Sequence, residues 1–185
     1  MEDNDPIRKL PDVDIIALIL NGNVNAFKFL VERYQDNVAS VVTGMLGSIP
    51  EAEDIGQEIF IRTFKSLKKF RFRSAFKTYL VRIAMNACLD EIKNRQKKKA
   101  FVPIDEGFEN RVKEDREQDF EIRDSLARAI RELNTDQRSV VILGMMDGYS
   151  TKETAAILRI PEGTVLSRLA RAQEKLRELL QHLLE

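Results

Sequence analysis

Apolar side chains recur every three or four residues along most of the chain, which is the spacing of one face of an α-helix. This periodicity predicts helices over residues 15–20, 27–46, 51–67 and 74–95, with the first capped by Asp12 or Asp14. The sequence Gly47-Ser48-Ile49-Pro50 breaks the pattern between the second and third helices. No alternating run is long enough for a β-sheet, so we expect an all-α protein.

A second helical region follows a stretch of different composition. Residues 97–121 turn first basic and then acidic, and they contain few aliphatic side chains. Such a stretch cannot bury enough apolar surface to offset its ordering, so it predicts a flexible acidic linker. Beyond it, helices are expected over 122–133 and 136–146, followed by two short ones. The predicted organisation is two small helical domains, 1–96 and 122–185, the second with four helices.

The last two helices have the most informative sequence in the chain, STKETAAILRIPEGTVLSRLARAQEKLREL. Ser150 precedes Glu153 by three residues, the capping-box spacing that starts a helix. Pro161 suits the first turn of the next helix, where no amide donor is needed. Two short helices with a tight turn between them are typical of a helix-turn-helix, whose second helix enters the DNA major groove.

The second of these helices has two distinct faces. Its predicted core stripe is Val165, Leu169, Ala172, Leu176 and Leu179. The other face carries polar and basic side chains, namely Thr164, Ser167, Arg168, Arg171 and Lys175. A charged stripe alone is equally well read as a solvated face, but the capped helix and the turn before it favour DNA contact. An arginine here can bind guanine in a bidentate fork or neutralise a phosphate.

Charge is unevenly distributed along the chain, although 30 basic and 30 acidic side chains cancel. Residues 62–99 carry 13 basic and 2 acidic groups, a net charge of 13 − 2 = +11. A segment of this kind attracts a polyanion at long range. Its run KSLKKFRFRSAFKTYL interleaves cations with aromatic rings, which suits unpaired strands on which bases can stack. Phe76 and Tyr79 are better read as core anchors, whereas Phe70 and Phe72 lie in the expected loop between helices.

Several classes of function are not favoured. No apolar run approaches the about 18 residues that cross a bilayer, and the acidic start is unlike a secretory signal, so we expect no membrane insertion. The single cysteine, Cys88, lies on an apolar helical pattern and suits packing in a reducing cytoplasm. His182 has no second ligand nearby and is read as a surface residue. Without a nucleophile–base pair or a metal cluster, the chain is expected to be no enzyme, with no metal, cofactor or small-molecule substrate.

The order of these parts resembles the extracytoplasmic-function group of bacterial sigma factors. Three stretches carry the resemblance: AEDIGQEIFIRTF, FKTYLVRIAMNACLDEIK and IPEGTVLSRLARAQEKLR. It implies a subunit that joins core RNA polymerase and directs it to promoter DNA, restrained by an anti-sigma factor. Departures from the family pattern include Phe72 and Arg73 in the loop, Arg159 at the turn where glycine is common, and Leu166 in place of a basic residue.

The resemblance also implies roles for individual residues. The helix over 51–67 would dock on the polymerase clamp through Asp54, Gln57, Glu58 and Ile61. The minus-ten element would be read by Phe70, Arg71, Phe72, Arg73, Lys77, Arg82, Asn86 and Lys93. The minus-thirty-five element would be read by the polar face already described, with Thr164, Ser167, Arg168, Arg171 and Lys175.

One alternative remains open from the residues alone. A free-standing transcriptional repressor or activator would also carry a C-terminal helix-turn-helix, joined to an N-terminal sensing domain. Such a regulator binds its operator tightly without polymerase, usually as a symmetric dimer. Reconstituted transcription separates the two, because only a sigma factor creates initiation by core polymerase.

Overall fold

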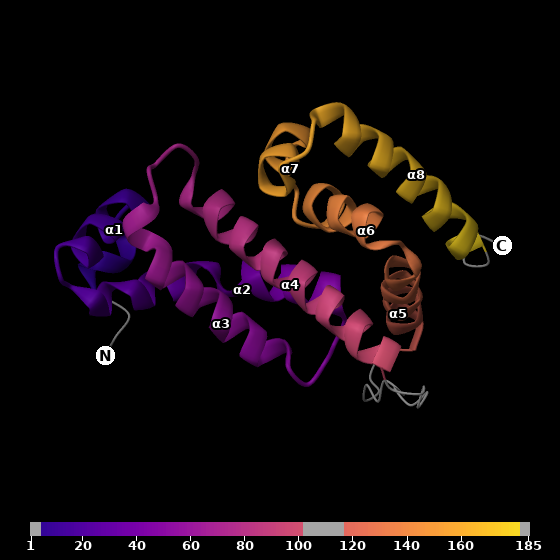
Figure 1. Ribbon diagram of the computed structural model, residues 1–185, viewed down its shortest axis with the longest axis horizontal. Coiled ribbons are helices and arrows are strands. Elements are labelled where there is room, and N and C mark those ends of the chain that lie inside the picture. Colours follow the sequence, from indigo (N-terminus) through magenta and orange to yellow (C-terminus); the bar gives the residue numbers. More distant parts are fainter. Residues whose placement is uncertain (1–4, 102–116, 182–185) are drawn as a thin grey trace.

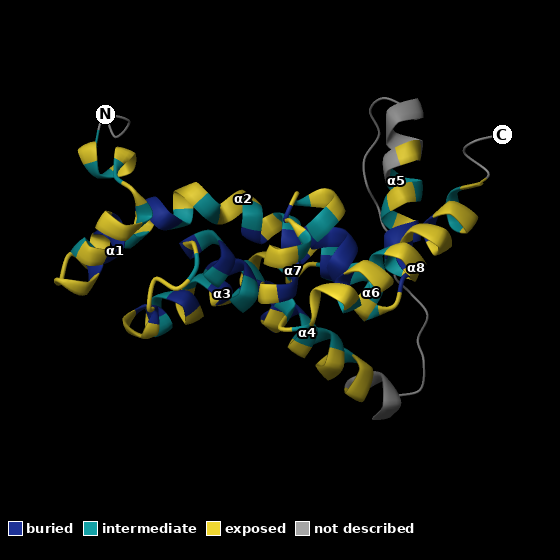
Figure 2. Cartoon of the chain, turned by 90° about the horizontal axis from the view of Figure 1, so that it is seen from above, coloured by how far each residue is buried: buried dark blue, intermediate teal, exposed yellow. Residues whose placement is uncertain are grey.

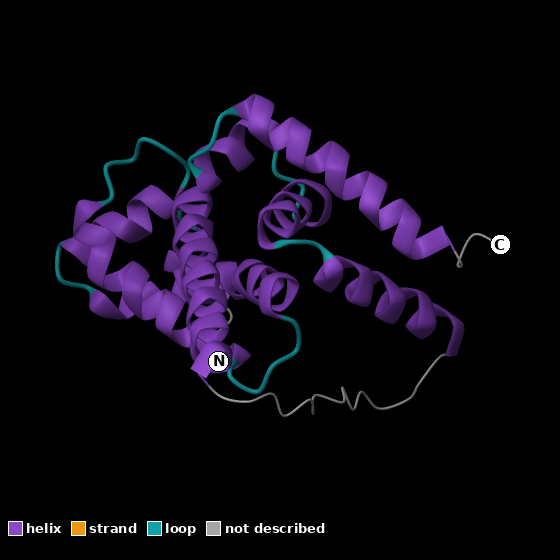
Figure 3. Ribbon diagram, turned by 45° about the vertical axis from the view of Figure 1, so that its right-hand side comes forward, coloured by secondary structure: helices purple, strands orange, loops and turns teal. Residues whose placement is uncertain are grey.

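The computed structural model describes residues 5–101 and 117–181, and every regular element in these two stretches is helical (Figures 1 and 3). The prediction of an all-α protein is therefore confirmed. Among the described residues, no helix has both the length and the apolar character needed to cross a bilayer. His182 lies outside the described residues.

The N-terminal unit consists of four α-helices joined by short turns. They are α1 (Asp12–Leu20), α2 (Phe27–Leu46), α3 (Ala52–Ser66) and α4 (Phe76–Phe101). Helix α2 packs against both α3 and α4, and these two also contact each other. Gly47 ends α2 with φ +79°, a left-handed conformation that a residue without a Cβ adopts at little cost. The predicted break between the second and third helices is thus confirmed.

The side chain of Asp12, which was expected to cap α1, instead connects α1 to α2. Pro11, and neither Asp12 nor Asp14, is the N-cap of α1, so the expected acidic cap is wrong. The Asp12 carboxylate instead accepts hydrogen bonds from Arg33 Nη1 and the Tyr34 hydroxyl, each at 2.5 Å. Two effects raise the pKa of Tyr34 above its ordinary value. Burial of the hydroxyl is the larger one, and the hydrogen bond to Asp12 is the next. A partner on another helix outcompetes local capping here.

The C-terminal unit contains the four predicted helices. They are α5 (Glu117–Glu132), α6 (Thr135–Val141), α7 (Thr151–Leu158) and α8 (Glu162–Leu180). Helix α6 continues into a π-helical turn over Ile142–Met146, and the chain then reverses at Gly148, whose φ is +71°. Asn134 caps α6 by accepting a hydrogen bond from the backbone N–H of Gln137 at 2.9 Å.

The predicted linker was too long at both ends. Helix α4 continues through the first residues of the stretch 97–121, as far as Phe101, and α5 begins at Glu117. Lysine, arginine, glutamate and glutamine form helices readily, and ion pairs support the last turns of α4. Arg95 there donates to Glu91 at 2.7 Å and to Glu51 at 3.2 Å. The rest of the predicted linker, residues 102–116, lies outside the described residues.

The two units share one buried core. The main cluster contains Met45, Leu80 and Val81 of the N-terminal unit together with Leu143 and Ile157 of the C-terminal unit. Helix α7 packs on α4, while α6 and the π turn pack on α2 (Figure 1). Buried residues accordingly gather in the middle of the molecule, between α1 and the end of α8 (Figure 2). The chain folds as one closed body, an arrangement that the sequence did not predict.

Polar contacts and one close approach fix the units relative to each other. Ser40 Oγ donates to Asp147 Oδ1 at 2.6 Å, and Arg138 Nη1 donates to the carbonyl of Met45 at 2.8 Å. A Cβ on Gly44 would lie 2.5 Å from Cδ1 of Ile142, closer than atoms can pack. Gly44 is therefore required for α2 to approach the π turn this closely, although glycine weakens a helix.

Candidate nucleic-acid interface

Helices α7 and α8 form the predicted helix-turn-helix. The Ser150 hydroxyl accepts from the backbone N–H of Glu153 at 3.2 Å, and the Glu153 carboxylate accepts from the backbone N–H of Ser150 at 2.9 Å. This is the capping box expected from the sequence. Hydrogen bonds from Ser150 lower the pKa of the Glu153 carboxyl, so the cap is charged at neutral pH.

Arg159, in the turn between the two helices, has a left-handed backbone conformation. Arg159 has φ +57° and ψ +44°. Glycine adopts this conformation at lower energy than a residue with a Cβ, so arginine is an unusual residue at this position. Pro161 is the N-cap of α8 and not part of its first turn, which moves the predicted helix start to Glu162. The extended ψ of Pro161, +148°, cannot continue the turn as helix, so α8 begins one residue later.

The two faces of α8 are those that the sequence predicted. Val165, Ala172 and Leu176 are buried, and Leu169 and Leu179 are partly buried against the core. Ser167, Arg171 and Lys175 are exposed on the other side, and Thr164 and Arg168 are half-buried beside them. The apolar stripe of α8 therefore packs against the core, and the polar face of the helix remains accessible.

Three of the predicted readers line one polar cleft. Thr164, Arg168 and Arg171 face the start of α6 across a cavity of about 530 Å³. Within it, Arg168 Nη2 lies 2.6 Å from Asp136 Oδ2, an ion pair that turns the guanidinium toward α6. The guanidinium of Arg171 donates to the carbonyl of Ser167 at 3.2 Å. Lys175 lies farther along the helix and pairs with Glu178 at 3.5 Å.

The loop between α3 and α4 holds a cluster of aromatic rings. Phe70 is buried, with its ring centroid 4.8 Å from both Phe72 and Tyr79 and 5.9 Å from Phe76. Phe72 is 49% exposed and has φ +54°, a strained conformation for a bulky residue. The structure thus separates two rings that the sequence grouped together. Phe70 anchors the loop, and Phe72 presents its ring to solvent.

The cationic side chains around this loop fall into two groups. Arg71, Arg73, Asn86 and Lys93 are exposed. Lys77 and Arg82 are half-buried, and they lie on different sides of α4. Lys77 Nζ sits 5.0 Å from the ring centroid of Tyr149 in the C-terminal unit. Arg82 Nε is buried and bonds to no other residue that the structure describes.

The predicted docking residues of α3 lie on one exposed face. Asp54, Gln57, Glu58 and Ile61 are all exposed and follow the spacing of one helical side. Glu58 pairs with Arg62 at 2.9 Å, and Ile61 is 45% exposed. Ile61 also lines an apolar groove of about 580 Å³ between the start of α2 and the end of α3. An apolar side chain beside a groove and among carboxylates is suited to a protein partner.

Two sets of residues near the candidate site were not predicted from the sequence. On α4, Thr78, Val81 and Met85 form a second buried stripe beside the predicted one. The run YLVRIAM carries the signal, because a helix that is apolar on more than one face is covered on more than one face. Asp136, the partner of Arg168, gave no sequence signal, since the pair depends on how α6 meets α8.

Fold and site together define a two-part helical DNA-binding protein with a C-terminal helix-turn-helix. Comparison with protein families is more specific. Residues 30–98 match Sigma-70 region 2, and residues 123–176 match Sigma-70, region 4. The chain belongs to the extracytoplasmic-function sigma factors of the sigma-70 family. A free-standing repressor or activator is not favoured, because both halves match sigma regions and not the helix-turn-helix alone.

Individual relatives agree with this assignment over nearly their whole lengths. The chain is 33% identical to the ECF RNA polymerase sigma factor SigW of Bacillus subtilis strain 168, covering 91% of this chain and 96% of that one. It is 34% identical to the ECF RNA polymerase sigma-E factor of Escherichia coli K12, covering 95% and 97%.

Solved structures show the same fold. CnrH, solved in complex with the cytosolic domain of CnrY, superimposes with a TM-score of 0.68 at 26% identity, covering 92% of this chain and 97% of that chain. The sigma factor RpoE of Bartonella quintana, solved in complex with the anti-sigma factor NepR, also gives a TM-score of 0.68, at 23% identity, covering 84% and 96%.

Proposed function

We propose that this sigma factor binds core RNA polymerase through the exposed face of α3 and directs it to promoters with two DNA readers. The loop after α3 and the exposed side of α4 read the minus-ten element as its strands separate. The polar face of α8 reads the minus-thirty-five element. The observation that carries the proposal is the cleft in which Thr164, Arg168 and Arg171 stand together on the open face of a capped helix-turn-helix.

The minus-ten assignment draws on the loop geometry. An exposed ring at Phe72, backed by buried Phe70 and flanked by Arg71 and Arg73, offers a stacking surface beside two cations. Stacking a base on an aromatic ring contributes about 1–3 kcal/mol, which offsets part of the cost of unstacking the duplex. The strained φ of Phe72 fits this use, because strain is retained where surrounding contacts hold a functional side chain.

Work is divided between the surfaces. Neither reader needs to bind tightly alone, because mounting both on polymerase makes the second contact effectively intramolecular. The chain itself makes no bond and acts in the cytoplasm with polymerase. The family also implies an anti-sigma factor as a partner, for which the groove beside Ile61 offers apolar area.

The test is transcription reconstituted from core RNA polymerase, the purified chain and genomic DNA fragments. We expect initiation at particular sites that core polymerase alone does not use. Arg168→Ala should reduce binding of the upstream element by the equivalent of about 1–3 kcal/mol while leaving polymerase binding intact. Glu58→Ala should do the reverse, weakening capture of polymerase in a pull-down.

Matched controls lie on the same kinds of surface. Arg177 is an exposed arginine near the end of α8, and Asp14 is an exposed carboxylate in the first turn of α1. Arg177→Ala and Asp14→Ala should leave upstream-element binding and polymerase capture, respectively, near the wild-type level. If Arg168→Ala and Glu58→Ala lose polymerase and DNA to the same extent, the proposed division of surfaces is wrong.

A further inference from the structure

The polar cleft between α6 and α8 contains a carboxylate among its arginines. The two helices pack against each other (Figure 1), and the cleft beside their contact has a volume of about 530 Å³. Thr164, Arg168 and Arg171 line it from α8, and Asp136 lines it from the start of α6. Asp136 Oδ2 lies 2.6 Å from Arg168 Nη2. A surface that is proposed to bind a polyanion therefore carries a negative charge beside one of its cations.

The two arginines of the cleft differ in what holds their guanidinium groups. The Arg168 side chain is only 24% exposed and is paired with Asp136. Arg171 is exposed, and its Nε donates to the carbonyl of Ser167 at 3.2 Å. Among the residues that the structure describes, no carboxylate pairs with Arg171. Arg171 can turn to a DNA phosphate without breaking an ion pair, whereas Arg168 has to share or lose its carboxylate.

The Asp136 carboxylate affects a phosphate and a base in different ways. A DNA phosphate carries a full negative charge, so a phosphate bound to Arg168 would be repelled by the carboxylate beside it. The major-groove edge of guanine presents two neutral acceptors, O6 and N7, which are not repelled in this way. A guanidinium has five N–H donors on a planar fork. Arg168 can therefore bond to Asp136 with one edge and to a base with another.

We propose that Asp136 is a specificity-determining residue of the helix-turn-helix, which holds Arg168 for a base edge and lowers the affinity of the cleft for backbone phosphate. Arg171 supplies the phosphate contact. Asp136 acts through Arg168 and is thus a positioning residue. The proposal deepens the proposed reading of the minus-thirty-five element and rests on it, because discrimination requires a preferred sequence.

A second effect of the same carboxylate has to be separated from this one. Asp136 lies in the first turn of α6, where the helix dipole favours a negative charge, although Asn134 is the residue that caps the helix. Glu162 is a matched case, because it is an exposed carboxylate in the first turn of α8 and does not line the cleft. Removing either charge weakens a dipole interaction, but only the loss of Asp136 releases Arg168.

The experiment measures the binding of holoenzyme, assembled from core RNA polymerase and each variant chain, to two duplexes. One is a fragment on which the wild-type holoenzyme initiates, and the other has the upstream part of that fragment scrambled at constant base composition. We expect Asp136→Asn to raise affinity for the scrambled duplex about two- to fivefold and to leave affinity for the fragment nearly unchanged. The ratio of the two affinities should fall by the same factor. Asp136→Glu keeps the charge and should keep the ratio near the wild-type value.

Two further variants test whether the effect passes through Arg168. Glu162→Gln should change affinity for both duplexes alike and leave their ratio unchanged, since it alters only the overall charge. In the Arg168→Ala background, Asp136→Asn should no longer change the ratio, because no guanidinium remains to be positioned. Thermal unfolding followed by circular dichroism checks that each variant is folded.

Three results would contradict the proposal. The ratio could be the same in Asp136→Asn and wild type, or it could fall equally in the Arg168→Ala background. It could also fall only because affinity for the fragment decreases, which is the result of a structural role. Initiation with any of these results overturns the role of Asp136 alone. A wild-type holoenzyme that initiates on no fragment rejects the proposed function and, with it, the preferred sequence on which the proposal rests.

Discussion

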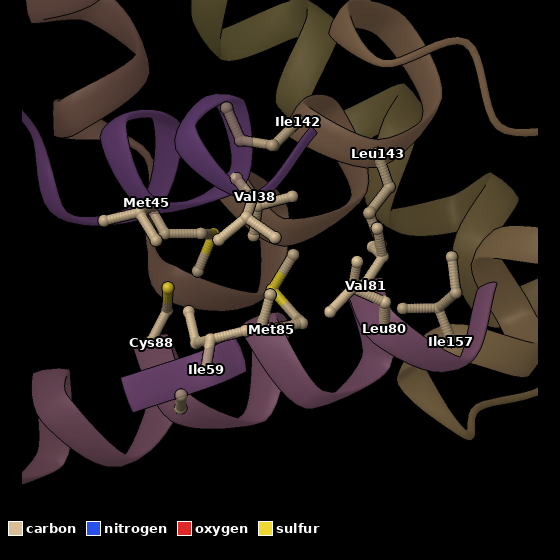
Figure 4. Close-up of a cluster of buried hydrophobic side chains, with 14 of the residues drawn as sticks. Val38, Met45, Ile59, Leu80, Val81, Met85, Cys88, Ile142, Leu143 and Ile157 are labelled. Carbon is tan, nitrogen blue, oxygen red and sulfur yellow. The ribbon is translucent and has the colours of Figure 1, made fainter. Parts of the chain in front are cut away.

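Helices α4 and α8 are both proposed to contact DNA, yet they are built into the molecule differently. Helix α8 places one apolar stripe, around Val165 and Ala172, on the core and leaves its polar face exposed. Helix α4 is buried on two faces, because Val81 and Met85 are covered as fully as Leu80 and Ala84. Part of this additional burial comes from the unit to which α8 belongs, because Val81 and Leu80 face Leu143 and Ile157 (Figure 4).

Under the proposed function, this difference affects how each helix can reach DNA. Arg168 on α8 is paired with Asp136 and still borders an open cleft, whereas Arg82 on α4 has a buried nitrogen with no described partner. A helix with one core face can present its other side without any change in the fold. A helix with two core faces must lose one packing contact first. Under the proposed function, the contact between the two units therefore restricts α4 more than α8.

The largest effect is expected from making the second face of α4 unable to pack. Val81→Asp places an unpaired charge at a position that is 0% exposed, which costs more than about 3 kcal/mol. Scattering should show an enlarged chain, and circular dichroism should show that the helices persist. Val13→Asp is the control, since Val13 is 50% exposed on α1. A Val81→Asp chain that stayed as compact as wild type would contradict the two-faced description of α4.

A smaller, pH-dependent effect is expected at Asp147. Burial raises the pKa of this carboxyl, while the hydrogen bond from Ser40 and the charge of Lys77 oppose that rise. The packed arrangement of the two units therefore holds this proton more tightly than an arrangement in which Asp147 is exposed to water. Closure should be strongest at low pH, near the ordinary Asp pKa of 3.8, and should weaken as pH rises through the raised pKa.

Asp147→Asn isolates this contribution. A neutral amide is cheaper to bury than a carboxylate with one unpartnered oxygen, so the variant should close more firmly at neutral pH, by about 1 kcal/mol. The same change should flatten the pH dependence of opening, followed by energy transfer between dyes on the two units. Tyr149, which also faces Asp147, stays neutral over this range because burial raises its pKa. A wild-type chain that closes more firmly as pH rises would exclude Asp147 as the controlling group.

The smallest effect is expected on α8. Asp136→Asn releases Arg168 from an ion pair whose carboxylate side chain is 64% exposed, so stability should change by less than about 1 kcal/mol. DNA binding should respond more clearly. Removing one negative charge from the cleft should raise affinity for unrelated duplex DNA and steepen its salt dependence. If neither quantity changes in a binding titration at several salt concentrations, the ion pair does not restrain Arg168.

Much of this could be predicted from local sequence. The capping box at Ser150 and the core stripe of α8 follow from spacing alone, because both involve residues within one or two helical turns. The exposed face of α3 follows for the same reason. Phe70 and Phe72 could not be separated, since two residues in a loop have no periodicity to assign their directions.

Helix limits were less predictable where a distant partner intervenes. Asp12 has the chemistry of a cap but binds Arg33 and Tyr34 on the next helix, so α1 begins without an acidic cap. The deciding contacts join residues 21 and 22 positions apart in the sequence. Local propensity has no information about such partners.

The sequence by itself determined the helices, the helix-turn-helix, the basic segment and membership of the sigma factors. Each of these depends on residues that are close together along the chain. Only the tertiary structure decided that the two units close on each other and that α4 has two covered faces. Packing between distant segments depends on shape, as at Gly44 beneath Ile142, and on pairs such as Ser40 with Asp147, which lie 107 positions apart. Contacts between such distant residues form only when the chain has folded.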